Sequence, residues 1–250
     1  MKYIEPTESE SEYQELVRLG KELGIPVPQG FLEIEVTLPD KQVLTSIRKR
    51  CHSWVRNGYN LAFCQAAGKD ASDSTFGAGK LSLKNTAGTL IYGTAPIIIG
   101  TGSGNAGSFG ANSTEAIGSG YRGATFTDTL GIVVGTTGGD NFEANALANR
   151  VVGGNGAGQL SYIQSLVHSP SYNAGTKTFT DTLSRFFNNN SGGVISIAEV
   201  GIYGLGGPKT GPSTSWPIYM VCRDVISPAV DVPDTAQLRI NYITSLIYPS

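Results

Sequence analysis

Three charged residues on neighbouring apolar segments are the clearest candidates for chemistry in this chain. Glu199 is the only carboxylate in the apolar and β-branched run at 194–203, and Arg185 and Arg223 stand in the runs before and after it. Side chains alternate along a strand, and both faces of the run are largely apolar, so we expect a central strand. An ion pair between Glu199 and either arginine would fix strand register more than it would add stability. The alternative places all three charges at strand ends in solvent, and neither arrangement is catalytic.

Other residue types that can carry chemistry lack the spacing that the chemistry needs. His52 and His168 have no cysteine or carboxylate at ligand spacing, so the sequence indicates neither a zinc site nor a Ser-His-Asp triad, although a triad could assemble in space. The cysteines are odd in number and favour buried free thiols. They are Cys51, Cys64 and Cys222. We therefore expect no catalytic residue, no metal site and no cofactor.

One glycine motif resembles a nucleotide-binding fingerprint. The segment GSGNAG at 102–107 matches G-x-G-x-x-G and follows an apolar run. The fingerprint requires its glycines to open a helix whose N-terminus holds a pyrophosphate, whereas the residues that follow here are SFGANS. We therefore expect no nucleotide binding.

Composition and charge narrow the classes of partner. Only 15% of the residues are charged, 33 of the 250 residues are glycine, and the net charge is -2. No block of Lys and Arg extends beyond residues 48–50, so the chain lacks the basic surface of a nucleic-acid-binding protein. No apolar stretch reaches the length of a membrane span, and the first residues lack the apolar run of a signal peptide. We expect neither nucleic acid nor a membrane span among its interactions.

Apolar and β-branched runs separated by turn residues recur along the chain and predict a mainly β fold. Strands are predicted at 31–38, 42–49, 81–92 as a hairpin, 97–99, 129–135, 158–167, 177–187, 194–203, 217–223 and 237–246. Residues 53–67 predict one short helix, although Gly58 disfavours it. Many short strands between turns indicate an antiparallel β-sandwich or jelly roll rather than a parallel sheet.

The N-terminal segment predicts an amphipathic helix at 8–23 followed by an extended connector at 27–30. Its first turn is acidic, and Gly24 and Pro26 follow its end. Four apolar residues at helical spacing are candidate assembly contacts: Tyr13, Leu16, Val17 and Leu23. This stripe needs a groove on its own domain or on a neighbouring subunit. We expect residues 1–30 to form an assembly arm and residues 31–250 to form the β-sandwich domain.

The sandwich domain carries a Gly-rich insertion at about 68–128. Within it, residues 100–123 form a long polar loop that is either a surface excursion or an interface loop. Trp216, in a Gly/Pro loop, is the candidate exposed aromatic contact. Trp54 and Tyr59, on the predicted short helix, are interpreted as core anchors rather than as a sugar-stacking platform.

Six segments, in this order, resemble a family of uncharacterised structural proteins of tailed bacteriophages and related proviruses. They are SWVRNGYNL at 53–61, GIVVGT at 131–136, GQLSY at 158–162, RFFNNNSGG at 185–193, VGIY at 200–203 and RDV at 223–225. The similarity spans roughly residues 31–245. The chain departs from the family pattern after Gly135, where TTGGD replaces a shorter link, and in its acidic N-terminal arm.

The resemblance implies a virion component of the head or the tail. We therefore expect a non-enzymatic structural protein that is made in the host cytoplasm, forms a homo-oligomer and contacts other capsid or tail subunits. A neutral, Gly-rich β domain with an amphipathic arm suits such repeated contacts. The alternative is a host-receptor or carbohydrate-binding module on the virion, with Trp216 and the loop at 100–123 as the contact surface.

Overall fold

The structure, a computed structural model, describes residues 8–51, 54–67, 83–91, 117–118, 120–139, 141–205 and 217–248. In chain order its elements are α1 (Glu8–Leu23), β1 (Val27–Thr37), β2 (Val43–Arg50), α2 (Arg56–Ala67), β3 (Leu83–Lys84), β4 (Leu90–Ile91), β5 (Gly131–Gly135), β6 (Ser161–Tyr162), β7 (Ser171–Asn173), β8 (Thr178–Asn188), β9 (Ile195–Leu205), β10 (Ile218–Val232) and β11 (Gln237–Ile247).

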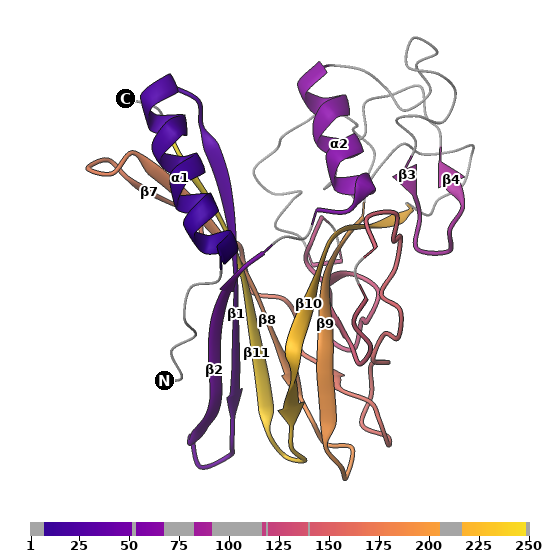
Figure 1. The fold of residues 1–250 in the computed structure, drawn as a ribbon. Helices are drawn as coiled ribbons and strands as arrows, with labels where there is room; N and C mark the ends of the chain where they lie inside the picture. Colours follow the sequence, from indigo (N-terminus) through magenta and orange to yellow (C-terminus); the bar gives the residue numbers. More distant parts are fainter. Residues whose placement is uncertain are drawn as a thin grey trace.

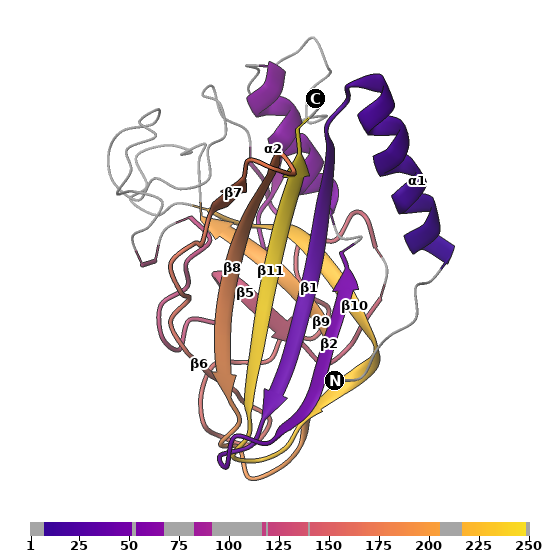
Figure 2. The same ribbon diagram turned by 90° about the vertical axis from the view of Figure 1, so that its left-hand side faces the viewer.

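Two antiparallel sheets pack face to face. The larger has the strand order β2-β1-β11-β8-β6, with β7 also paired to β8, and the smaller has the order β10-β9-β5. In Figure 2 the larger sheet faces the viewer and β5, β9 and β10 lie behind it. The prediction of a mainly β, antiparallel sandwich with an N-terminal helix and one further short helix is confirmed (Figure 1).

The core lies between the two sheets and follows the alternation of side chains along the strands. In β1, for example, Leu32, Ile34 and Val36 are buried, whereas the residues between them are only partly buried. Strand β9 is the middle strand of the smaller sheet, as its two apolar faces predicted. Burying both faces of β9 requires a further layer outside it, and residues 141–151 supply part of that layer through Leu147, whose N–H donates to the Tyr203 hydroxyl at 2.7 Å.

Helix α2 covers the smaller sheet at one end of β10 (Figure 1). The buried Asn57 amide donates to the carbonyls of Lys84 and Met220, at 2.8 and 3.1 Å, so it connects α2 to both β3 and β10. A Cβ atom at Gly58 would lie 2.5 Å from the Val221 carbonyl oxygen. The glycine that disfavours a helix on propensity alone is therefore needed for close packing of this helix on β10.

Strand β1 begins earlier than the sequence pattern indicated. Residues 27–30 do not form a connector, because β1 pairs with β11 from Val27 opposite Ile247 onwards. Pro28 is tolerated because its carbonyl points away from β11 and accepts a hydrogen bond from the Tyr13 hydroxyl. The missing N–H of proline therefore falls on the side where no strand pairs. The predicted boundary between the arm and the sandwich domain, at residue 30, therefore falls inside β1. The N-terminal segment that lies outside the sheet ends at Pro26.

Helix α1 has the predicted bounds, and its end has a clear cause. Gly24 adopts a left-handed conformation with φ 67°. The N–H of Ile25 then donates to the Gly20 carbonyl at 2.8 Å, which is the hydrogen bond of a Schellman cap. At Gly20 a Cβ atom would lie 2.5 Å from Cγ2 of Val27, so this glycine lets the chain return directly into β1.

The remaining predicted segments were shortened, present as predicted, or outside the described residues. The predicted strand at 158–167 is paired as a strand only at β6, after which its backbone follows the edge of β8 through single hydrogen bonds. The hairpin near 81–92 is present as β3 and β4. The strand at 97–99, the glycine motif at 102–107, most of the loop at 100–123, His52, Trp216 and the side chain of Cys64 lie outside the described residues.

Candidate functional site

Arg185 is fully buried between the sheets, but it does not meet Glu199. Strand β8 belongs to the larger sheet, whereas β9 belongs to the smaller one, so the two side chains are never cross-strand neighbours. All five N–H donors of the guanidinium reach backbone carbonyls at 2.7 to 2.9 Å. The acceptors are Ile163, Leu130, Ile132, Ala124 and Thr127. Burial lowers the pKa of Arg185 to about 10, which leaves it charged at neutral pH.

This arginine organises the irregular segments at one side of the sandwich. Its guanidinium carbon lies 4.8 Å from the centre of the Tyr162 ring, so a cation–π contact adds to the hydrogen bonds. A Cβ atom at Gly123 would lie 2.7 Å from Nη1 of Arg185 and 2.3 Å from the Leu130 carbonyl oxygen. Arg185 therefore holds residues 124–132 and 163 against β8, as a structural centre rather than as one half of an ion pair.

Glu199 forms its ion pair with Arg223 on the neighbouring strand β10. Nε and Nη2 of Arg223 donate to Oε2 at 2.8 and 2.6 Å, and the two side chains are 6% and 0% exposed. The second carboxylate oxygen accepts the Asn149 N–H at 3.1 Å. Gly135 on β5 leaves room for the carboxylate, because a Cβ atom there would lie 2.5 Å from Oε1. The structure thus contains the structural pair with Arg223 and excludes the arrangement in which these charges end in solvent.

A second polar cluster lies between the sheets near the start of α2. The Tyr242 hydroxyl donates to the buried carboxylate of Asp224. Burial raises the pKa of Tyr242 well above its ordinary value, and burial likewise raises the pKa values of the Cys51 and Cys222 thiols. Both cysteines are free, with Cys222 buried and Cys51 half-buried. Protonated, shielded thiols fit the expectation of free cysteines and are poor nucleophiles.

His168 contacts a carboxylate that sequence spacing did not indicate. Its Nδ1 lies 2.7 Å from Oδ2 of Asp181 on β8, and both side chains are partly buried. The contact forms because residues 163–169 follow the edge of β8, where the Ser169 N–H donates to the Thr182 carbonyl at 3.1 Å. Thirteen positions separate the two residues, and no periodicity of a strand or helix links them.

Helix α1 lies outside the sandwich and is attached in part through Arg50 at the end of β2. Nη2 of Arg50 lies 2.8 Å from Oε1 of Glu10, and Nη1 donates to the Gln29 side chain at 3.0 Å. The guanidinium is also stacked between two rings, 4.3 Å from the Tyr13 centroid and 4.7 Å from the Phe31 centroid. We call Arg50, Phe31, Gln29 and the Pro28 carbonyl the Arg50 socket. No local sequence pattern indicates this socket, because Glu10 and Arg50 lie 40 positions apart in the chain.

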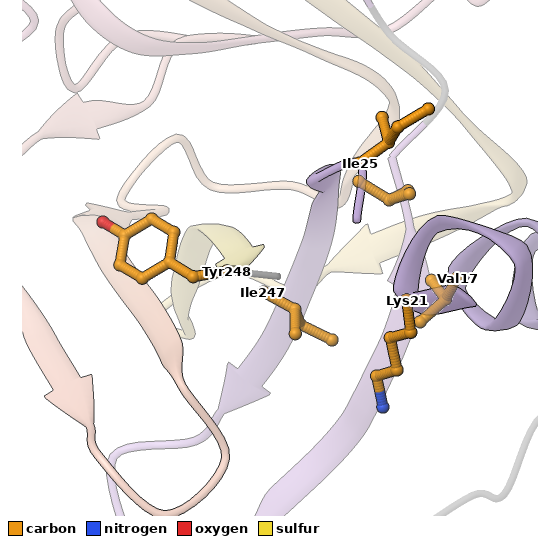
Figure 3. Close-up of a pocket in the computed structure, with 6 residues that line it drawn as sticks. Val17, Lys21, Ile25, Ile247 and Tyr248 are labelled. Atoms are coloured by element: carbon orange, nitrogen blue, oxygen red, sulfur yellow. The ribbon is translucent and has the colours of Figure 1, made fainter. Parts of the chain in front are cut away.

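The four candidate assembly residues of α1 divide into two groups. Tyr13 enters the Arg50 socket, and Val17 lines a small hollow between α1 and the ends of β1 and β11 (Figure 3). The other members of this hollow are Lys21, Ile25, Val27, Ile247 and Tyr248. Leu16 and Leu23 remain 49% and 69% exposed, so docking on its own sheet leaves part of the apolar stripe in water.

An exposed aromatic surface lies at the start of α2. The Trp54 and Tyr59 rings are 5.6 Å apart edge to face, and Tyr59 and Phe142 are 5.9 Å apart. Trp54 is 47% exposed and Tyr59 is 55% exposed, so the interpretation of both as core anchors is wrong. The buried residue beside them is Val55, because its N–H pairs with the Val221 carbonyl and turns its side chain inward. We call Trp54, Tyr59 and Phe142 the aromatic surface.

Comparisons with protein-family models, with curated proteins and with solved structures found no match. Within the described ranges, no helix is long and apolar enough to cross a membrane. The same part of the chain contains no cluster of three or more His, Cys, Asp or Glu side chains that could hold a metal ion.

Proposed function

We propose that this protein is a non-enzymatic structural component of a tailed-bacteriophage virion, made in the host cytoplasm and incorporated as a capsid decoration or tail subunit. The observation that carries the proposal is the position of α1. The helix is held on the outer side of the sandwich by the Arg50 socket, and it presents Leu16 and Leu23 to solvent. An apolar stripe displayed on a folded domain suits contact with a neighbouring subunit. The six segments that resemble virion proteins supply the class of particle.

The interior supports the same proposal. Repeated contacts in a particle require each copy to present the same surface. Arg185 fixes five backbone carbonyls, and the Glu199–Arg223 pair joins β9, β10 and the segment at Asn149. Buried, fully bonded charges of this kind favour one arrangement of strands and loops over others.

The proposal is tested by peptide mass spectrometry of purified particles separated into capsids and tails. We expect peptides of this protein in one of the two fractions, at a copy number comparable with that of other structural proteins. Recovery only from infected-cell lysate, with none in either fraction, would contradict the proposal. The fraction that contains the protein also decides between head and tail.

A second candidate function is recognition of a host-surface glycan, which the aromatic surface favours. Sugars stack their C–H faces on exposed aromatic rings, and the Arg56–Glu143 ion pair beside the rings, at 3.1 Å, offers groups that bond hydroxyls. A glycan array tests it: reproducible binding that is lost in Trp54→Ala and kept in Tyr172→Ala supports a glycan site at this surface. Tyr172 is the control because it is also an exposed aromatic residue, 55% exposed against 47% for Trp54, but lies on β7. Loss in Trp216→Ala instead would place the contact at Trp216.

A further inference from the structure

The Arg50 socket recognises a specific segment rather than any apolar helix. It combines the Arg50 side chain, which is only 10% exposed with α1 in place, the Phe31 ring that stacks on it, the Gln29 side chain and a backbone carbonyl acceptor. These groups fit an acidic residue followed three positions later by a tyrosine on a helix, which is the arrangement of Glu10 and Tyr13. Every copy of the chain carries both the socket and the segment that fills it.

The link between α1 and β1 is short and crowded. Gly24, Ile25 and Pro26 alone separate the two elements, and the chain reverses through a left-handed glycine. The reversal also requires the close approach at Gly20, whose Cβ position is 2.5 Å from Val27. Short connections under such constraint favour exchange of a terminal element between copies, because opening the turn removes the crowding.

Docking of α1 on its own sheet leaves a row of apolar side chains in water. Leu16, Leu19 and Leu23 are exposed at spacings of three and four residues, and Ile25 is exposed just beyond them. An isolated helix of this length is marginal in water, so α1 depends on the surface on which it docks. A second copy placed against α1 could cover the row while the socket keeps its contacts.

We propose that α1 is exchanged between two copies of this chain, so that Glu10 and Tyr13 of each copy occupy the Arg50 socket of the other. This inference rests on the proposed function, because it specifies how one subunit contacts the next. The exchange preserves every socket contact, and it adds an interface between the copies at Leu16, Leu19 and Leu23. The occupant of the socket is thereby defined as α1 of a second copy, with the charge of Glu10 complementary to that of Arg50.

A mixture of two charge-reversed variants of the full-length protein tests the exchange. In Glu10→Arg the helix carries the wrong charge for its own socket, and in Arg50→Glu the socket carries the wrong charge for its own helix. Each variant alone should therefore elute as a monomer. In an equimolar mixture both trans combinations are complementary, so light scattering after size-exclusion chromatography should show a doubled mass. A mixture that stays monomeric overturns the proposal.

Arg48→Glu is the matched control for Arg50→Glu. Arg48 lies on the same strand and also stacks on Phe31, at 4.5 Å, but its ion pair is with Glu33 rather than with α1. Arg48→Glu keeps both Glu10 and Arg50, so this variant alone should form the exchanged dimer. Its mixture with Glu10→Arg should contain no dimer of the two variants together, because the arginine introduced at position 10 would meet an unchanged Arg50. A mixed dimer detected by native mass spectrometry would overturn the specificity of the socket.

Deletion of Ile25 provides an independent test if either charge variant fails to fold. The shortened link cannot turn back into the same copy, so exchange predicts a dimer, whereas a monomer with an undocked α1 overturns the proposal. These measurements use pure protein in solution. Failure of the exchange would therefore leave the mass-spectrometric test of virion membership unaffected.

Discussion

Replacing Glu199 by Gln would remove the charge of the buried ion pair while nearly preserving the shape of the side chain. Arg223, only 6% exposed, would then be left as an uncompensated charge in the protein interior. Removing one partner of a buried pair costs about 3–5 kcal/mol of unfolding free energy. Removing one partner of an exposed pair costs about 0–1 kcal/mol. Glu143→Gln is therefore the matched control, because the pair that Glu143 forms with Arg56 is partly exposed to solvent.

The assay is urea unfolding monitored by circular dichroism, with thermal melting as a second measure. For a domain of this size about 2–4 °C of melting temperature corresponds to 1 kcal/mol, so we expect a decrease of about 6–20 °C. A double-mutant cycle with Arg223→Met separates the pair from packing, because the double variant leaves no buried charge and should lose less than the sum of the single losses. A loss below about 0.5 kcal/mol, or a loss equal to that of Glu143→Gln, would refute the reasoning that a buried charge is left without its partner.

Four further predictions follow from the buried groups and from α1. Arg185→Lys should lower the unfolding free energy by more than about 3 kcal/mol in urea titrations, because a single ammonium cannot reach five carbonyls; unchanged stability would contradict its role. Gly123→Ala should lower the unfolding free energy by about 1–3 kcal/mol in the same assay, since its Cβ would overlap Arg185. An unchanged unfolding free energy would show that the loop moves to make room for the Cβ. Deleting residues 1–24 should leave a domain that melts cooperatively, because β1 pairs with β11 without α1; a chain that fails to fold would place α1 in the core. Burial raises the pKa of Tyr203 from 10.0 to about 12, so the folded state holds this proton more tightly than the unfolded state does. The resulting stability is present below pH 10 and should be lost between pH 10 and about 12. A free energy of unfolding that stays constant across this range would contradict the prediction.

The sequence predicted most elements of the fold because their signals are local. Alternating apolar residues identified β1, β8, β9 and β11, and an acidic first turn with a glycine stop identified α1 at its observed bounds. These signals depend on side-chain period and capping, which act within one turn or one strand. Central placement of β9 was predictable for the same reason, because a strand buried on both faces must be apolar on both.

The candidate sites were predictable only in part, because they depend on which strands become neighbours. The sequence left both Arg185, 14 positions before Glu199, and Arg223, 24 positions after it, as possible partners, and the division into two sheets selected Arg223. Trp54 was expected in the core because large aromatic residues usually bury their surface. The bridge between Trp54 and Cys222 and the pairing of Val55 turned Trp54 outward instead.

The sequence by itself determined the class of the fold, the helical arm and the residues able to form a buried ion pair, since periodicity, capping and residue type are properties of short segments. Only the tertiary structure decided that Arg185 binds carbonyls, that Arg50 holds Glu10, and that Gly58 lies against β10. Each of these contacts joins residues tens to more than a hundred positions apart. Such contacts depend on which segments the packed sheets bring together, because a buried charge or a missing Cβ stabilises the fold only where the matching group lies beside it.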